Sequence, residues 1–131
     1  MRRLISESLA LARDAGDFKA FRTAYHESFR QPIACDSRET VPAALAIVWL
    51  AAGDPWQAAV FGANFGRDSD TIACMAGGIC GALSGIDAGT KAKLQLLPTQ
   101  TLAFQQKLAR ELVEVHHAKA AAERDALSNS I

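Results

Sequence analysis

The chain has 131 residues, half of them hydrophobic and only 7% aromatic, and its 14 basic side chains balance 14 acidic ones. A net charge of zero gives no electrostatic basis for binding nucleic acid or an anionic membrane. The longest apolar run, Ala43 to Ala52, is too short to span a bilayer, and the N-terminus lacks the apolar core of a signal peptide. We therefore expect one cytoplasmic domain, residues 1–131, with no membrane and no nucleic-acid partner.

The spacing of apolar residues predicts an all-α protein, because no stretch alternates apolar and polar residues as a strand does. Gly16 and Gly85 are typical helix stop signals. Pro42 is expected in the first turn of its helix, where the backbone donor is unpaired anyway. Residues 86–98, with Gly89 and Pro98, are predicted to be a linker, and residues 128–131 a frayed end. The predicted helices cover about residues 3–15, 18–29, 40–52, 55–64, 70–84 and 99–125.

Two of these helices, at 40–52 and 70–84, are apolar or small on nearly every side. Helices of that kind are usually buried all round, and the remaining helices are too few to cover both. We therefore expect a partner surface, either in a homo-oligomer or on another polypeptide. The three cysteines have no metal-type spacing and are expected to be buried, reduced thiols: Cys35, Cys74 and Cys80.

The segment Asp68-Ser69-Asp70-Thr71 lies where a loop is expected to enter the helix at 70–84. Asp68 and Asp70 would point nearly opposite ways in a continuous helix, but they can converge if Asp68 lies in the loop and Asp70 in the first turn. Carboxylate and hydroxyl oxygens are ligands for Mg²⁺, Mn²⁺ or Ca²⁺. The alternative interpretation is helix capping, for which Asp, Ser and Thr are also the preferred residues.

Other candidates carry weaker signals. Arg67 has two interpretations: it binds a phosphate bidentately, or it pairs with Glu39 or an Asp. His116 and His117 point about 100° apart on a helix and cannot grip one metal ion together. Ser84 has no His or Asp arrangement around it in the sequence.

Several short sequence blocks of this chain, taken in order, resemble the C-terminal half of the ADP-ribosylglycohydrolases. The members of that family include the dinitrogenase-reductase-activating glycohydrolase. The spacing of the blocks agrees over roughly residues 36 to 90. A match of several blocks is far more specific than the Asp-x-Asp-Thr string alone. The blocks are Glu39-Thr40-Val41-Pro42-Ala43-Ala44-Leu45, Gly53-Asp54, Ala63 to Ala73, Met75 to Gly78 and Gly81 to Gly85.

The resemblance implies an all-α orthogonal bundle with a two-metal Mg²⁺ or Mn²⁺ centre that hydrolyses the N- or O-glycosidic bond of ADP-ribosyl conjugates. In the family's pattern, Asp68, Asp70 and Thr71 are metal ligands. Asn64, Gly66 and Arg67 are then candidates for substrate binding beside the metal, with ADP-ribose or an ADP-ribosylated substrate as the partner.

The sequence also departs from the family's pattern. It contains neither the Gly-Asp-Ala block nor the Thr-Asp-Asp-Thr block of the family's N-terminal half, and the latter supplies the other metal ligands. Two hypotheses follow. In one, the chain carries part of the metal site of a hydrolase whose N-terminal half is absent from this chain or is supplied by a complementary chain. In the other, it is a truncated, non-catalytic helical protein that binds a partner or oligomerises.

Overall fold

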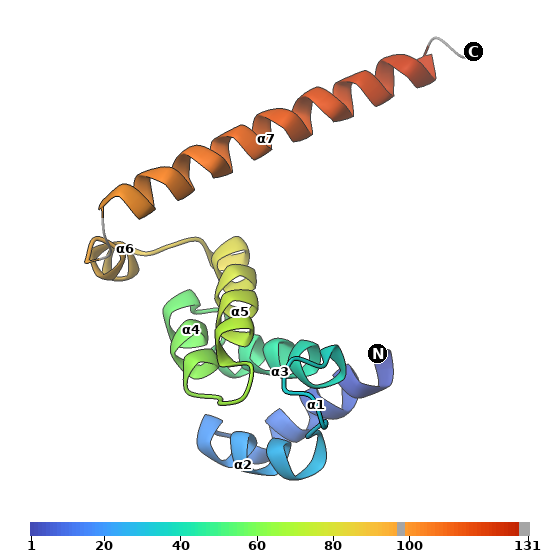
Figure 1. Ribbon diagram of the computed structural model, residues 1–131, viewed down its shortest axis with the longest axis vertical. Helices are drawn as coiled ribbons and strands as arrows, with labels where there is room; N and C mark the ends of the chain where they lie inside the picture. The colour runs from blue at the N-terminus through green and yellow to red at the C-terminus, as the bar shows by residue number, and fades with distance from the viewer. Residues whose placement is uncertain (97–98, 129–131) are drawn as a thin grey trace. The chain divides into compact units, whose positions relative to one another are not determined.

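The structure is a computed structural model that describes residues 1–96 and 99–128. Those residues form helices and no strand, which confirms the all-α prediction. Pro98 and residues 129–131, for which a linker and a frayed end were predicted, lie outside the described part of the chain. The helices are α1 (Arg2–Ala15), α2 (Phe18–Ser28), α3 (Ser37–Leu50), α4 (Pro55–Ala63), α5 (Ser69–Ser84), α6 (Ala88–Leu94) and α7 (Thr99–Ser128) (Figure 1).

The chain divides into two compact units, residues 1–87 with α1 to α5 and residues 88–131 with α6 and α7. In the first unit α4 packs along α5, and α3 packs against both α1 and α5. Figure 1 shows α4 and α5 side by side, with α3 crossing near the base of α5. The loop between α4 and α5 therefore lies at one end of a packed helix pair.

Short polar residues begin most of the helices in the first unit. The carboxylates of Asp17, Asp36 and Asp54 accept hydrogen bonds from the backbone N–H groups of Ala20, Arg38 and Gln57. Such bonds satisfy donors that the first helical turn leaves unpaired. At the other end of α1, Gly16 adopts the left-handed conformation (φ 74°) expected of a helix stop signal.

Two boundary predictions were wrong. Helix α3 begins at Ser37, three residues earlier than predicted, because Asp36 caps it. Pro42 is therefore inside the helix and not in its first turn. The predicted linker contains a short helix, α6, which the single glycine at position 89 does not prevent.

Part of the core of the first unit is an aromatic cluster from α2 and the residue after it, joined by Phe65 from the loop before α5. Phe21 and Tyr25 are fully buried, and Phe29 stacks on Tyr25 with ring centroids 4.4 Å apart. The ring of Phe65 packs edge-on against Tyr25 at 5.4 Å and is also fully buried. The aromatic side chain of Phe65 thus attaches the loop to α2.

Helix α5 is buried along one side only, where Ile72, Ala76 and Cys80 face the other helices. Its other sides are partly or fully exposed, which agrees with the prediction that the remaining helices of this chain are too few to cover it. Of the three cysteines, Cys80 is buried, and burial raises the pKa of its thiol, with the Asp54 carboxylate adding to the rise. Cys74 and Cys35 are exposed, contrary to prediction.

In the second unit, α7 is long and almost entirely exposed. Its apolar side chains include Phe104, Leu112 and Val115, each more than half exposed. Lys107–Glu111 and Lys119–Glu123 form ion pairs one turn apart along its surface, and such pairs support an isolated helix. None of the helices in the described ranges combines the length and apolarity needed to cross a membrane.

Candidate metal-binding loop and its anchors

The loop from Asn64 to Asp68 joins α4 to α5 and contains two residues with left-handed backbone. Gly66 has φ 94°, which glycine adopts readily, and Arg67 has φ 59°. A non-glycine residue in that region costs on the order of 1–3 kcal/mol and persists only where its surroundings hold it. The contacts of this loop show what holds Arg67 there.

The first anchor of the loop is the backbone carbonyl of Phe65. It accepts hydrogen bonds from Arg22 Nε at 2.7 Å and from His26 Nε2 at 2.9 Å, both on α2. Because a carbonyl oxygen only accepts, Nε2 of His26 carries a proton in this arrangement. The His26 ring also lies 4.8 Å from the Phe65 ring. Both the main chain and the side chain of Phe65 are therefore fixed to α2.

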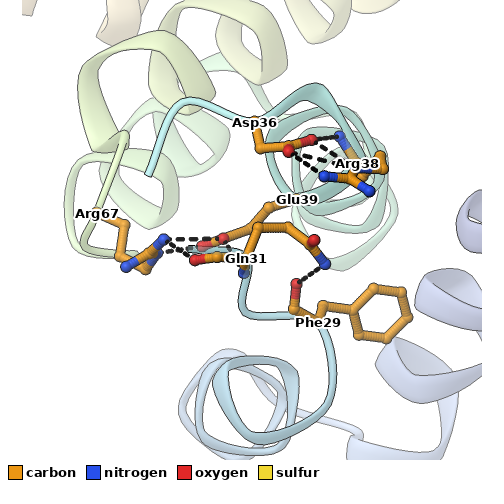
Figure 2. Close-up of polar contacts among 6 residues, drawn as sticks. All are labelled: Phe29, Gln31, Asp36, Arg38, Glu39 and Arg67. Atoms are coloured by element: carbon orange, nitrogen blue, oxygen red, sulfur yellow. Dashed lines mark hydrogen bonds and ion pairs between the residues drawn. The ribbon is translucent and has the colours of Figure 1, made fainter. Parts of the chain in front are cut away.

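The second anchor is the side chain of Arg67 (Figure 2). Its Nε and Nη2 donate to the two carboxylate oxygens of Glu39 on α3, with the Nη2–Oε2 distance 3.1 Å. Nη2 also donates to the backbone carbonyl of Gln31 at 2.6 Å, while the Gln31 N–H donates to Glu39 Oε2 at 2.7 Å. The Glu39 side chain is 1% exposed and that of Arg67 17%. This is a mostly buried, bidentate ion pair, the arrangement in which arginine and carboxylate geometries agree best.

The aromatic core fixes Glu39 in turn. The Tyr25 hydroxyl donates to the Glu39 backbone carbonyl at 2.7 Å. Burial raises the pKa of Tyr25 well above its ordinary value, and the nearby Glu39 carboxylate adds to the rise, so the phenol keeps its proton at neutral pH. A continuous set of hydrogen bonds therefore runs from Tyr25 through Glu39 to Arg67.

Directly after Arg67, Asp68 is the residue before the first turn of α5, with φ −84° and ψ 50°, and Asp70 lies in that first turn. This is the loop-then-helix placement under which the two carboxylates were predicted to converge. Asp68 is partly buried, whereas Asp70 and Thr71 are exposed. The Thr71 hydroxyl donates to Asp68 Oδ1 at 2.9 Å, so two of the three candidate ligands lie together at the helix entrance.

Asp68 differs from the other aspartates that precede helices in the first unit. Asp17, Asp36 and Asp54 each accept a backbone N–H, whereas the Asp68 side chain makes no such capping bond in the described structure. Its carboxylate contacts the side chain of Thr71 instead. Asp68 therefore begins α5 without the backbone hydrogen bond that the capping interpretation implies.

The donor set agrees in chemistry with a hard divalent cation, because two carboxylates and a hydroxyl are ligands that Mg²⁺ and Mn²⁺ accept. Three side-chain oxygens do not complete six-fold coordination. No group of three or more His, Cys, Asp or Glu side chains placed to hold a metal ion occurs in residues 1–96 and 99–128. A cation at this loop would take its remaining ligands from water molecules or from another segment.

The other candidate residues differ in exposure and in their contacts. Gly66 is partly exposed and Asn64 is exposed, with Asn64 Nδ2 donating to the Val60 carbonyl at 2.8 Å. Arg67 makes the pairing with Glu39 that the sequence left open as one of two interpretations. His116 and His117 lie on the exposed helix α7.

Sequence reasoning missed most of the anchors. Glu39 was considered only as one possible partner of Arg67, and neither Arg22 nor Gln31 was singled out. Glu39 carries no clear signal of burial in the sequence, because an acid in the first turn of a helix is ordinarily exposed. Arg22 carries no such signal, since an arginine on an amphipathic helix is ordinarily a surface residue.

A sequence model of the ADP-ribosylglycohydrolase family matches residues 1–122. The chain belongs to the ADP-ribosylglycohydrolase family. Among the curated proteins similar to this member, the uncharacterized protein YegU of Escherichia coli (strain K12) is 56% identical over 50 residues. Those residues make up 38% of this chain and 15% of the length of YegU. No solved structure matches this family member significantly.

The match confirms the resemblance predicted from the sequence blocks, and it extends on both sides of them, from α1 into α7. This family member is therefore related to hydrolases that act on ADP-ribosylated substrates and that are generally metal-dependent. The all-α structure agrees with that membership.

Proposed function

We propose that this chain supplies Asp68, Asp70 and Thr71 to a Mg²⁺ or Mn²⁺ site that serves hydrolysis of the glycosidic bond in ADP-ribosyl conjugates. The observation that supports the proposal most is the Asp68 carboxylate, which stands at a helix entrance without capping it and contacts Thr71. A carboxylate that accepts no hydrogen bond from the backbone N–H groups of its own helix has lone pairs available for another ligand.

A bound cation would supply Lewis acidity and would orient a water molecule and the ribose hydroxyls. The chain's own part is to hold two carboxylates and a hydroxyl at the start of a packed helix. The further ligands are proposed to come from a segment with a Thr-Asp-Asp-Thr block, which the 131-residue sequence does not contain. We propose that such a segment is provided by a complementary polypeptide.

Asn64 and Gly66 are proposed to lie beside the ADP-ribose. Both precede Asp68 in the same loop and both are at least partly exposed. Gly66 has no side chain, and a Cβ built there would make ordinary contacts with Arg22 Nη2 at 3.5 Å and His26 Nε2 at 3.9 Å. A ribose or phosphate oxygen can approach such a backbone closely.

A second candidate function is a non-catalytic protein that binds a partner or oligomerises. It is favoured by apolar side chains that the described chain leaves exposed, above all on α7 and at the end of α5. Burying such side chains in an interface is favourable by about 25 cal/mol for each Å² of apolar surface. The two functions are compatible, because an interface can also bring the remaining metal ligands.

Calorimetric titration of the chain with Mn²⁺ and Mg²⁺ tests the metal site. We expect binding in the micromolar range or tighter for the wild type, and no heat for Asp68→Ala or Asp70→Ala. Asp17→Ala is the matched control, because Asp17 also precedes a helix but makes an ordinary capping bond. Absence of binding by the wild type would favour the non-catalytic function.

Catalysis is tested by the release of ADP-ribose from ADP-ribosyl-arginine. We expect little release by the chain alone and substantial release after addition of a polypeptide carrying the Thr-Asp-Asp-Thr block. Full activity of the isolated chain would contradict the proposal that further ligands are needed. Loss of the reconstituted activity in Asp70→Ala would connect the activity to this loop.

A further inference from the structure

We propose that the Glu39–Arg67 ion pair positions the acidic loop, and that Arg67 acts through this pair and not by contacting a substrate phosphate. The pair would set where Asp68 and Asp70 stand relative to α3. The inference rests on the proposed function only for the identity of the ligand that the two aspartates bind.

The first argument is the engagement of the guanidinium group. The Nε and Nη2 edge of Arg67, which binds oxyanions bidentately, is occupied by both carboxylate oxygens of Glu39. Nη2 also donates to the Gln31 carbonyl at 2.6 Å. A phosphate would have to displace a buried carboxylate from this edge and leave that carboxylate unpaired, which is strongly unfavourable.

The second argument is the position of Arg67 in the chain. It immediately precedes Asp68 and has a left-handed backbone (φ 59°), which arginine does not favour. Its side chain reaches back to α3 and to the segment after α2, which are distant in sequence (Figure 2). The ion pair is therefore the contact that holds the backbone of Arg67, and with it the backbone entering Asp68, in this conformation.

The third argument is the rigidity of the partner. Glu39 lies in the first turn of α3, and its carbonyl accepts the Tyr25 hydroxyl. Its carboxylate also accepts the Gln31 N–H. Residues that orient metal ligands from outside the coordination shell typically change metal affinity by about 10–100-fold when they are substituted.

The test compares Mn²⁺ affinity and amide hydrogen exchange in the full chain. The double variant Glu39→Gln/Arg67→Gln removes both charges together, so no buried charge is left unpaired and the chain is expected to fold. We expect its Mn²⁺ affinity to fall about 10–100-fold, and the exchange of the 66–71 amides to quicken about tenfold or more, while exchange within α1 stays unchanged. Arg67→Lys, which retains a cation opposite Glu39, should recover part of both effects.

The control is Asp54→Ala, which removes the capping hydrogen bond of 2.9 Å from the Gln57 N–H at the end of α4 opposite the loop. It should lower the melting temperature but leave Mn²⁺ affinity and loop exchange unchanged. If the wild type binds no Mn²⁺, the proposed metal function fails, and the exchange data alone decide the positioning role. Wild-type loop exchange in the double variant, or an equal effect of Asp54→Ala on the loop, would overturn the inference.

Discussion

The two compact units of the chain use apolar side chains in opposite ways. In residues 1–87, Phe21 and Tyr25 of α2 are buried and pack against the loop before α5. Polar contacts from α2 and α3 also hold this loop. In residues 88–131, the large apolar residues of α7 between Phe104 and Leu127 are exposed. The first unit has the contacts that define a fixed loop geometry, whereas α7 displays an apolar surface of the kind that another surface covers.

This contrast shows that different kinds of contact determine the structure of the two units. The geometry of the candidate metal loop depends on contacts between residues far apart in sequence, such as Glu39 and Arg67. The form of α7 depends on local helix propensity and on ion pairs one turn apart. Substitutions in the two units are therefore expected to affect different measurements.

The largest expected effect is on the buried ion pair. Arg67→Ala should reduce the free energy of unfolding of the first unit by about 3–5 kcal/mol, because it leaves the Glu39 carboxylate buried without its partner. Glu39→Gln/Arg67→Gln should cost clearly less, since no buried charge remains unpaired. Urea unfolding followed by tryptophan fluorescence measures this, because both tryptophans, Trp49 and Trp56, lie in the first unit. Equal losses in the two variants would show that the pair is not energetically coupled.

The next effect concerns the contact between α4 and α5. A Cβ at Gly62 would lie 2.4 Å from the Ala73 Cα, which is backbone and cannot move aside easily. We expect Gly62→Ala to destabilise the first unit by about 1–3 kcal/mol through overpacking. Gly78→Ala is the matched control on α5, because a Cβ there meets nothing within 4 Å. Gly78→Ala should instead stabilise the first unit by about 0.5–1 kcal/mol, because alanine has a higher helix propensity than glycine. Destabilisation of both variants alike would refute the close-packing argument.

A smaller effect on stability, with a change in assembly, is expected from α7. Leu112→Ser should alter the unfolding free energy of the first unit by less than about 0.5 kcal/mol, because Leu112 is exposed and lies in the other unit. If α7 forms the proposed interface, light scattering should show an oligomer for the wild type and a smaller species for Leu108→Ser/Leu112→Ser. If light scattering shows the wild type to be a monomer, self-association through α7 is excluded.

The smallest effect is the pH dependence of a surface pair in the first unit. The hydrogen bonds and charge of Arg38 lower the pKa of Asp36 from 3.8 to about 2. Because the folded-state pKa is the lower one, this contribution to stability is present above the ordinary pKa and is lost as the pH falls from about 4 to about 2. An NMR titration should show the pKa of Asp36 rising toward 3.8 in Arg38→Gln, and an unchanged pKa would contradict the assigned cause.

Much of this architecture could be predicted from the sequence, because helix periodicity and stop signals are local. The extent of α2 and the glycine end of α1 are examples. The start of α3 was missed because Asp36 caps it from within an apparent loop. Helix α6 was missed because seven residues give too little periodicity to distinguish a short helix from a linker.

The candidate site could be predicted in part. The order of acids and hydroxyl in Asp68-Ser69-Asp70-Thr71 is visible in the sequence, and so is its place before an apolar helix. The contacts that fix the loop are not visible, because Phe65 and Arg22 are 43 residues apart and no local pattern connects them. Local rules identify the candidate ligands, whereas tertiary packing decides how they are held.

The most direct test of the central claim, that Asp68 and Asp70 were placed to bind a divalent cation, is paramagnetic broadening of amide resonances by substoichiometric Mn²⁺. The account predicts that the amides of Asp68 to Thr71 broaden first and that Asp68→Asn abolishes this selectivity. Broadening that is centred instead on Asp54 and Asp87, or that is the same in Asp68→Asn as in the wild type, would contradict it.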